Sequence, residues 1–409
     1  MTLSKNRGIT SCRACDSSEL SEVLNLGLSP IANTLPLKDS PLNENSYPLI
    51  LRLCNSCGLG QIGEFETPDE IFSVYPYLSR TSATWIDHGR SFAEGIVRDF
   101  PKISSGYILE IASNDGYLLQ HFMEKNMAVL GVEPAANVAE IAQSHGIPTI
   151  PEFFGVELAK RILKTHGYPS LIIANNVAAH VPDMLDFFSG LSLLCSSSTL
   201  ISIENPSLGY LFENGYYDTI YHEHFSYLSV KPIRLLSNKV GMELFRVDNL
   251  ETHGGSLRYL LCKKDILNIE DSVVLHESRE TLRGIGAPLM FENFANNINR
   301  SVMELRSWVS SQNDGSIIGY GAAAKTVTTF HAAGLDQKKF RCIVDSNKLK
   351  QGKRLPGTNI EISSPEVLKG DSPTVLIFPW NIQDELARFI CGLNPRAKIW
   401  VHNPLKLLN

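Results

Sequence analysis

The chain has 409 residues, of which 43% are hydrophobic and 20% charged, and its formal net charge is -6 at pH 7. A chain of this length exceeds one hydrophobic core, so we expect two to four domains. The acidic balance argues against nucleic-acid binding, which needs a basic surface. No apolar stretch reaches the roughly 18 residues of a membrane span. The N-terminus lacks a signal-peptide core and the cysteines form a poor disulfide framework, so we expect a cytoplasmic protein.

Two C-x-x-C pairs near the N-terminus predict a metal site. Each pair can present two thiolates from one turn, and four thiolates suit a closed, structural Zn²⁺ site. We expect the metal to support folding rather than chemistry. The alternative is four reduced cysteines without metal. The proline-containing segment between the pairs is expected to be a surface insertion. The predicted ligands are Cys12, Cys15, Cys54 and Cys57.

From residue 106 onward, short apolar runs alternate with helical segments. The pattern predicts helices at residues 117–123 and 137–144. Strands alternating with helices indicate a parallel sheet, which binds its ligand at the carboxyl ends of the strands. The expected strands cover residues 106–112, 128–133, 147–150, 171–176 and 199–204.

Two acids and one turn in this unit indicate the type of cofactor. Glu110 lies in the first strand, and Glu133 ends the second, where a carboxylate can accept both hydroxyls of a ribose. NAD enzymes and S-adenosylmethionine enzymes share that device. The turn at residues 112–116, however, is Ala-Ser-Asn-Asp-Gly and lacks the G-x-G-x-x-G of a pyrophosphate site. An acidic turn suits a cofactor with an ammonium and a sulfonium, so S-adenosylmethionine is favoured, and a turn without ligand is the remaining alternative.

The densest group of titratable side chains lies at residues 216–227, Tyr-Tyr-Asp-Thr-Ile-Tyr-His-Glu-His-Phe-Ser-Tyr. Histidine changes its charge near neutral pH, and an adjacent carboxylate can tune or orient it. Two uses are open: a metal site through His222-Glu223-His224, or a general base supported by tyrosine hydroxyls. In an extended segment the two histidines would share a face, and in a helix they would not. In either case one of them can be structural.

A second α/β unit is expected near the C-terminus, after a long amphipathic helix at residues 289–310. The turn Gly319-x-Gly321 lacks the third glycine of a dinucleotide site, but its amides and Lys325 can hold a phosphate. His253-Gly254-Gly255 predicts a tight turn into a strand, and a substrate role for His253 is open. The first expected strand of this unit begins at residue 316, and the others cover residues 341–345, 375–378 and 398–401.

Together these motifs resemble the nucleotide-sugar C-methyltransferases, above all the zinc-containing sugar 3-C-methyltransferases of deoxysugar biosynthesis. The resemblance covers almost the whole chain in the same order. It implies an α/β protein with a zinc-binding domain at 1–75, a class I S-adenosylmethionine domain with a Rossmann-like fold at 76–245, and a Rossmann-like domain at 246–409 that helps hold the nucleotide sugar. The motifs that carry it are the two cysteine pairs, Glu110-x-x-x-Asn114-Asp115-Gly116, residues 131–137, 221–227 and 252–258, and Gly319-Tyr320-Gly321-Ala322-Ala323-Ala324-Lys325.

The reaction that the resemblance implies is methylation of a sugar carbon next to a ketone, typically C3 of a dTDP-4-keto-deoxysugar. A proton alpha to the carbonyl must leave, and the enolate must be stabilised and presented to the sulfonium methyl. A neutral histidine suits the first step because its pKa lies near the operating pH. Tyrosine hydroxyls or a second histidine suit the enolate.

Carried onto the matching positions, the resemblance implies that His224 is the general base. Glu223 and Tyr221 would bind or orient the substrate, and Tyr75 and His180 would approach from opposite walls. Ala112 replaces the glycine of many such enzymes, without an expected loss of binding. Lys325 and His253, weighed above, remain the candidate substrate residues. The implied cofactor residues are Glu110, Ala112, Asn114, Glu133, Asn175 and, against the adenine, Phe153.

Two other functions compete with this interpretation. One is an NAD-dependent oxidoreductase that uses the Gly319-x-Gly321 turn, against which the missing third glycine counts. The other is a non-catalytic zinc-containing binding protein with a vestigial methyltransferase fold, against which the Asn114-Asp115-Gly116 turn and Glu133 count.

Overall fold

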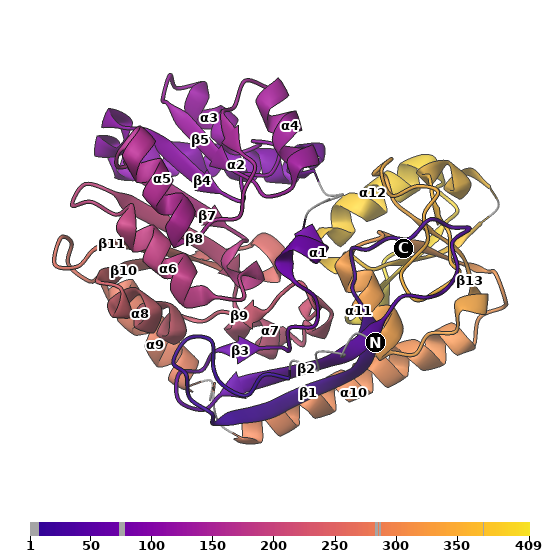
Figure 1. Cartoon of the computed structure of the whole chain (residues 1–409). Helices are drawn as coiled ribbons and strands as arrows, with labels where there is room; N and C mark the ends of the chain where they lie inside the picture. The colour runs from indigo at the N-terminus through magenta and orange to yellow at the C-terminus, as the bar shows by residue number, and fades with distance from the viewer. Residues whose placement is uncertain (1–7, 73–77, 283–284, 286–287, 371) are drawn as a thin grey trace, which may run out of the picture.

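Three β-sheets, each centred on a different part of the chain, organise the computed structural model (Figure 1). The structure describes residues 8–72, 78–282, 285, 288–370 and 372–409. No helix within these ranges is both long and apolar enough to cross a membrane.

The first sheet is antiparallel and has the strand order β1-β2-β3-β9. Its strands are β1 (Leu20–Pro30), β2 (Ser46–Cys54), β3 (Gly60–Gln61) and β9 (Ser226–Tyr227). A short helix, α1 (Pro68–Phe72), follows β3. The last strand, β9, comes from the histidine-rich segment predicted at residues 216–227. The histidine-rich segment therefore contributes the edge strand of the N-terminal sheet.

The segment between the two cysteine pairs is not the surface insertion that we expected. It forms the long β1–β2 hairpin, which runs beside α10 (Pro288–Ser310) along the bottom of the molecule in Figure 1. Leu49, Leu51 and Leu53 alternate along β2 and are at most 1% exposed, in a core shared with α10 and the C-terminal sheet. The expectation was wrong because alternating leucines need a partner to bury them.

The central sheet has seven strands in the order β10-β11-β8-β7-β4-β5-β6. The five strands from β8 to β6 are parallel, β11 is antiparallel to β8, and β10 is antiparallel to β11. The strands are β4 (Ile108–Ile111), β5 (Val129–Val132), β6 (Thr149–Ile150), β7 (Leu171–Asn175), β8 (Leu200–Pro206), β10 (Met242–Leu250) and β11 (Ser256–Lys263).

Helices cover both faces of the central sheet. They are α2 (Ala83–Asp99), α3 (Leu119–Met123), α4 (Ala136–Ser144), α5 (Val156–His166), α6 (Met184–Leu193), α8 (Val230–Lys239) and α9 (Asp271–Leu282), with α7 (Leu208–Asn214) beyond β8. The domain boundary that we placed between residues 245 and 246 falls inside β10. The central sheet continues beyond it because β10 and β11 form an antiparallel hairpin on the edge of β8.

The C-terminal sheet has the order β14-β13-β12-β15-β16-β17 and is parallel except for β17. Its strands are β12 (Ile317–Tyr320), β13 (Phe340–Val344), β14 (Ile362–Ser363), β15 (Thr374–Ile377), β16 (Lys398–His402) and β17 (Leu405–Leu407), and its helices are α11 (Ala324–Ala332) and α12 (Gln383–Leu393). The predicted second α/β unit and the predicted long helix before it, now α10, are both confirmed.

A buried ion pair joins the β1–β2 connection to the C-terminal part. The Arg354 side chain is 1% exposed and binds both carboxylate oxygens of Glu44, one of them at 3.0 Å from Nη1. It also donates to the Pro41 carbonyl at 2.8 Å and the Thr358 carbonyl at 3.1 Å. The N-terminal hairpin is therefore fixed to the C-terminal part by polar as well as apolar contacts.

The substitution Arg354→Met should destabilise the folded chain by about 3–5 kcal/mol. The Glu44 side chain is only 13% exposed, and its charge would remain there without the partner. Urea unfolding measures the loss. Lys38→Met is the matched control, since Lys38 pairs with Glu361 at 3.5 Å between the same two parts of the chain, with both side chains nearly half exposed. We expect that exposed pair to contribute less than about 1 kcal/mol. Equal losses in the two variants would contradict the prediction.

The same pair makes part of the stability depend on pH. Burial raises the pKa of the Glu44 carboxyl, but the hydrogen bonds and charge of Arg354 outweigh burial and leave that pKa below its ordinary value. The contribution is therefore present above the pKa of an unfolded glutamate. It is lost as the pH falls through the lower, folded value.

Candidate active site and metal centre

The four predicted cysteine ligands meet in the N-terminal part. Their Sγ atoms all lie within 4.8 Å of one another, with 3.5 Å between Cys12 and Cys57 and 3.5 Å between Cys15 and Cys54. Four thiolates at about 2.3 Å from a shared Zn²⁺ require separations of this size. In the described part of the chain, this is the only group of histidine, cysteine and acidic side chains close enough to share a metal ion. The zinc interpretation is confirmed, and the His222-Glu223-His224 alternative has no support.

The predicted cofactor residues lie at the carboxyl ends of β4, β5 and β7. Glu133 directly follows β5 and is 6% exposed. One of its carboxylate oxygens accepts from the Asn114 amide at 3.0 Å and the other from the Ala135 amide at 2.9 Å. Asn114 Oδ1 accepts from the Ser79 amide at 2.9 Å. The acid at the second strand and the turn after the first strand are thus joined directly.

Three buried acids, Glu110, Asp115 and Glu133, lie at this edge of the sheet. Glu110 and Asp115 are each 1% exposed, and Glu110 Oε2 and Asp115 Oδ1 have no hydrogen-bond partner. Burial, together with the nearby acids, raises the pKa of Glu110 well above its ordinary value, and burial raises the pKa of Glu133 to about 7. Unpaired buried carboxyls favour a cationic ligand. The residues therefore fit S-adenosylmethionine, which carries an ammonium and a sulfonium.

Other predicted cofactor residues differ in their surroundings. Asn175 ends β7 and is 8% exposed, and neither polar atom of its side chain has a partner. Ala112 has a φ of 55°, in the left-handed region that costs a non-glycine residue about 1–2 kcal/mol. Alanine is therefore unusual at this position, where the backbone conformation favours glycine. The Phe153 side chain is 40% exposed, beyond β6.

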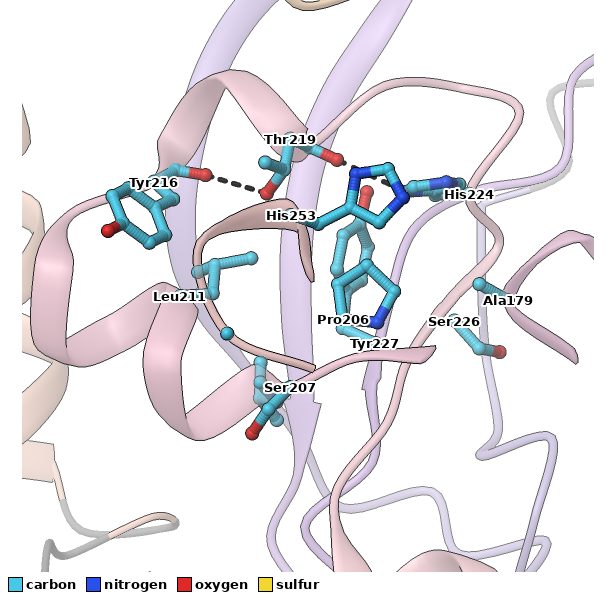
Figure 2. A pocket seen from close by; sticks show the side chains of 12 residues that line it. Ala179, Pro206, Ser207, Leu211, Tyr216, Thr219, His224, Ser226, Tyr227 and His253 are labelled. Carbon is cyan, nitrogen blue, oxygen red and sulfur yellow. Dashed lines mark hydrogen bonds between the residues drawn. The ribbon is translucent and has the colours of Figure 1, made fainter. Parts of the chain in front are cut away.

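Beside the ends of β7 and β8 lies a pocket, shown in Figure 2. Its wall brings together two of the predicted site residues, His224 and His253, which are 29 positions apart in the chain. The pocket is lined by Ala179, Pro206, Ser207, Leu208, Leu211, Tyr216, Thr219, His224, Ser226, Tyr227, His253 and Gly255.

His224 is held by hydrogen bonds at both ring nitrogens. Its Nδ1 lies 3.2 Å from the Thr219 carbonyl oxygen, drawn as a dashed line in Figure 2, and its Nε2 lies 2.7 Å from the Tyr221 hydroxyl. Burial, with the nearby His180 and His253, lowers the pKa of His224 well below its ordinary value, so the ring is neutral at pH 7. A carbonyl only accepts, so we assign the hydrogen to Nδ1 and the lone pair to Nε2.

His180 and Glu223 adjoin His224. The centroids of the His180 and His224 rings are 4.6 Å apart, and His180 Nδ1 donates to the Glu223 carbonyl at 2.6 Å. Burial lowers the pKa of His180 to about 4 and raises the pKa of Glu223 to about 7. Glu223 Oε1 accepts from the amide and side chain of Asn33 at 2.8 and 3.1 Å, and Oε2 has no partner.

The two histidines of the segment have different surroundings. His222 is 2% exposed, lies 3.4 Å from the Pro48 carbonyl, and meets the rings of Tyr47 and Phe65 edge-on. It packs against the N-terminal sheet, so it is the structural member of the pair. Tyr75, the remaining predicted catalytic residue, lies outside the described residues.

The predicted substrate residues, Lys325 and His253, come from different parts of the chain. Lys325 begins α11 with Ala324, and its Nζ lies 2.8 Å from Asn381 Oδ1 and 4.3 Å from the centroid of the Trp380 ring. Burial lowers the pKa of Lys325 to about 8. Burial, and then the charge of Lys325, lower the pKa of His253 to about 3. A methyl group added at Gly254, next to His253, would lie 2.5 Å from the Trp380 ring that Lys325 also contacts, so both residues lie at one junction.

One buried acid of the site was missed from the sequence. Glu204 in β8 is fully buried and binds His88 at 2.9 Å, Arg258 at 3.0 Å and the Thr252 hydroxyl at 3.3 Å. It thereby ties α2 and β11 to the turn that carries His253. A signal was present, because Glu204 follows Glu110 and Glu133 as a third acid late in an expected strand.

The seven-stranded sheet, with buried acids at the ends of its first two strands and a four-cysteine site before it, defines a class I methyltransferase with a zinc-binding domain. Family models match a zinc binding domain at residues 12–72, a methyltransferase domain at 85–247 and a C-methyltransferase C-terminal domain at 251–393. The C-methyltransferase NovU of Streptomyces niveus is 31% identical over 385 residues, which cover 93% of this chain and 92% of that relative. The chain belongs to the zinc-containing, S-adenosylmethionine-dependent C-methyltransferases.

Solved structures resemble part of the chain. Magnesium protoporphyrin IX methyltransferase ChlM from Synechocystis PCC 6803, with bound SAM, has a TM-score of 0.32 and 14% identity and matches 44% of this chain and 79% of its own. The CcbJ methyltransferase from Streptomyces caelestis has a TM-score of 0.34 and 13% identity and matches 43% and 89%. Both TM-scores are low, so neither likeness extends to ligands or residues.

Proposed function

We propose that this protein transfers the methyl group of S-adenosylmethionine to a carbon alpha to the ketone of a nucleotide-linked keto-deoxysugar, at C3 of a dTDP-4-keto sugar. The observation that carries the proposal is the orientation of His224. A neutral imidazole with its hydrogen assigned to Nδ1 has the lone pair of Nε2 beside a pocket wall and a tyrosine hydroxyl. Carbon methylation next to a ketone needs a base and an enolate stabiliser of this kind.

In the proposed first step, the proton on the carbon alpha to the ketone moves to His224 Nε2. The electrons of the broken C–H bond form the enolate. The Tyr221 hydroxyl, which binds Nε2 at 2.7 Å before the substrate arrives, is the donor nearest the base, and we assign it to the enolate oxygen. The Thr219 carbonyl continues to accept from Nδ1 and stabilises the imidazolium that forms.

Glu223 and His180 are assigned to substrate binding. Glu223 Oε2 is buried without a partner, so it can accept a hydrogen bond from a sugar hydroxyl at little further desolvation cost. His180 keeps its Nδ1 on the Glu223 carbonyl and turns its ring toward His224. His180 therefore lies beside the base, and Glu223 directly precedes the base in the chain.

Glu133, Asn114, Asn175 and Glu110 are the residues that we assign to the cofactor. When bound, S-adenosylmethionine would supply an electrophilic methyl group on its sulfonium. The chain contributes the two buried acids and the unpaired amide of Asn175 at the ends of β4, β5 and β7.

Glu133→Gln should weaken S-adenosylmethionine binding by roughly 10- to 100-fold, since a hydrogen bond to a charged group contributes about 1.5–3 kcal/mol. Titration calorimetry measures the affinity. Asp345→Asn is the matched control, because Asp345 directly follows β13 of the C-terminal sheet as Glu133 directly follows β5. This variant should bind S-adenosylmethionine as tightly as the wild type. The assignment of Glu133 fails if both variants bind S-adenosylmethionine as tightly as the unaltered chain.

The NAD-dependent alternative loses support at the C-terminal turn. Asp345 Oδ2 accepts from the Ala322 amide at 2.9 Å, so an acid already occupies the amide that a pyrophosphate would need. A methyl group added at Gly321 would lie 2.4 Å from the Pro379 ring. The loop that follows β15 therefore packs directly on this turn. Both features disfavour a dinucleotide there.

Incubation with S-adenosylmethionine labelled in its methyl group and a panel of nucleotide-4-keto sugars tests the proposal. We expect label on a sugar carbon alpha to the ketone, located by NMR of the product. Label on oxygen or nitrogen would contradict C-methylation of a keto sugar. Tight S-adenosylmethionine binding without transfer to any sugar of the panel would favour the non-catalytic alternative.

A further inference from the structure

The zinc-binding domain contacts the segment that carries the proposed base, residues 216–227, which we call the catalytic segment. The end of this segment is β9, which pairs with β3 in the N-terminal sheet, Gly60 opposite Tyr227 and Gln61 opposite Ser226. The sheet that carries the ligand Cys54 at the end of β2 therefore includes a strand that begins two residues after His224.

Arg13 links the metal site to this segment. It lies between the ligands Cys12 and Cys15, and its Nη1 donates to the carbonyls of Ile62 and Phe225, each at 3.0 Å. Its guanidinium carbon also lies 5.7 Å from the centroid of the Phe225 ring. A charged donor makes the stronger class of hydrogen bond. Arg13 thus fixes the carbonyl one residue after His224.

Asn33, three residues after the end of β1, holds the residue before His224. Its backbone amide and its side-chain Nδ2 both donate to Glu223 Oε1, at 2.8 and 3.1 Å. This leaves Glu223 Oε2 as the free acceptor. The chain on both sides of His224 is therefore held by residues of the N-terminal sheet domain.

We propose that Arg13 and Asn33 are positioning residues through which the zinc-binding domain sets the geometry of His224 and Glu223. This inference rests on the proposed function of those two residues. Neither Arg13 nor Asn33 is assigned to substrate or cofactor. Their effect on turnover comes from the placement of the base, and a displacement of about 1 Å at a reacting group can cost 100-fold in rate.

Arg13→Met and Asn33→Ala test the inference in the full chain, with Lys239→Met as the control. Lys239 Nζ donates to the Ala14 carbonyl at 2.8 Å, so it contacts the same cysteine turn but not the catalytic segment. We expect all three variants to retain zinc and their S-adenosylmethionine affinity. We expect kcat to fall about 100-fold in Arg13→Met and about 10-fold in Asn33→Ala, and to stay within about twofold in Lys239→Met.

Two further readouts separate positioning from loss of stability. In Asn33→Ala the limb of the kcat–pH profile that reports Glu223 should move to higher pH, because the lost donor favoured the ionised carboxylate. The imidazole NMR signals of His224, assigned through His224→Asn, should shift in Arg13→Met without any substrate. The second readout tests the inference even if the wild-type chain methylates no keto sugar, a result that would overturn the proposed function alone.

Zinc-loaded Arg13→Met with wild-type kcat and unchanged His224 signals would overturn the inference. So would equal losses in Arg13→Met and Lys239→Met, because the effect would then come from the cysteine turn as a whole. If Arg13→Met does not fold, Asn33→Ala decides, since it removes a single side-chain donor and leaves the backbone amide on Glu223. Wild-type kcat together with an unmoved pH profile in that variant would likewise refute a positioning role.

Discussion

His224→Asn is expected to lower turnover by about 100- to 10,000-fold, the range that a general base contributes. It should also abolish exchange of the substrate's alpha proton with deuterated solvent. Asparagine can still donate to the Thr219 carbonyl and accept from the Tyr221 hydroxyl, the two contacts of His224, but it cannot take up a proton. Steady-state kinetics and NMR of the sugar in D₂O measure the two effects.

His222→Asn is the matched control for this prediction. It alters the same residue type in the same segment, but His222 packs on Tyr47 and Phe65 of the zinc-binding domain. We expect it to lower thermal stability while alpha-proton exchange continues. S-adenosylmethionine affinity should be unchanged in His224→Asn, since that residue is not assigned to the cofactor. Normal exchange and turnover in His224→Asn would remove His224 from the role of base.

The sequence was sufficient where the chemistry is local. Each cysteine pair presents its thiolates within one turn, and Glu133 ends a strand that its apolar run predicts, so both features could be placed without the structure. The preference for His224 over His222 came from the family resemblance. The structure then separates the two. Residues 220–225, which include both histidines, form neither a strand nor a helix, so periodicity does not tell which way each side chain points.

Contacts between distant parts of the chain could not be predicted. Asn33 and Glu223 are 190 residues apart, and Arg13 and Phe225 are 212 apart, and no local pattern indicates that either pair meets. The β1–β2 hairpin is a different case. The alternation of Leu49, Leu51 and Leu53 was visible in the sequence, but the prolines nearby were given more weight.

Removal of the metal is expected to abolish turnover and to unfold the N-terminal sheet. Structural zinc sites contribute roughly 10–16 kcal/mol of apparent binding energy, which is folding energy for the segment that carries the ligands. Because β9 belongs to both that sheet and the catalytic segment, His224 should lose its position with the metal. S-adenosylmethionine affinity should survive, since its proposed residues lie on β4, β5 and β7. Chelation followed by activity and calorimetry measures both, and added Zn²⁺ should restore turnover.

Cys54→Ser should reproduce the effect of chelation, and Cys195→Ser is its control. Cys195 is a buried thiol, 3% exposed, that lies outside the four-cysteine group, so its variant should keep both zinc and turnover. If turnover were lost together with S-adenosylmethionine binding, the metal would support the whole chain rather than the catalytic segment. Undiminished turnover in metal-free chain would show that His224 holds its position without the zinc-binding domain. Selective loss of turnover is the result expected of a metal that orders the base from outside the pocket.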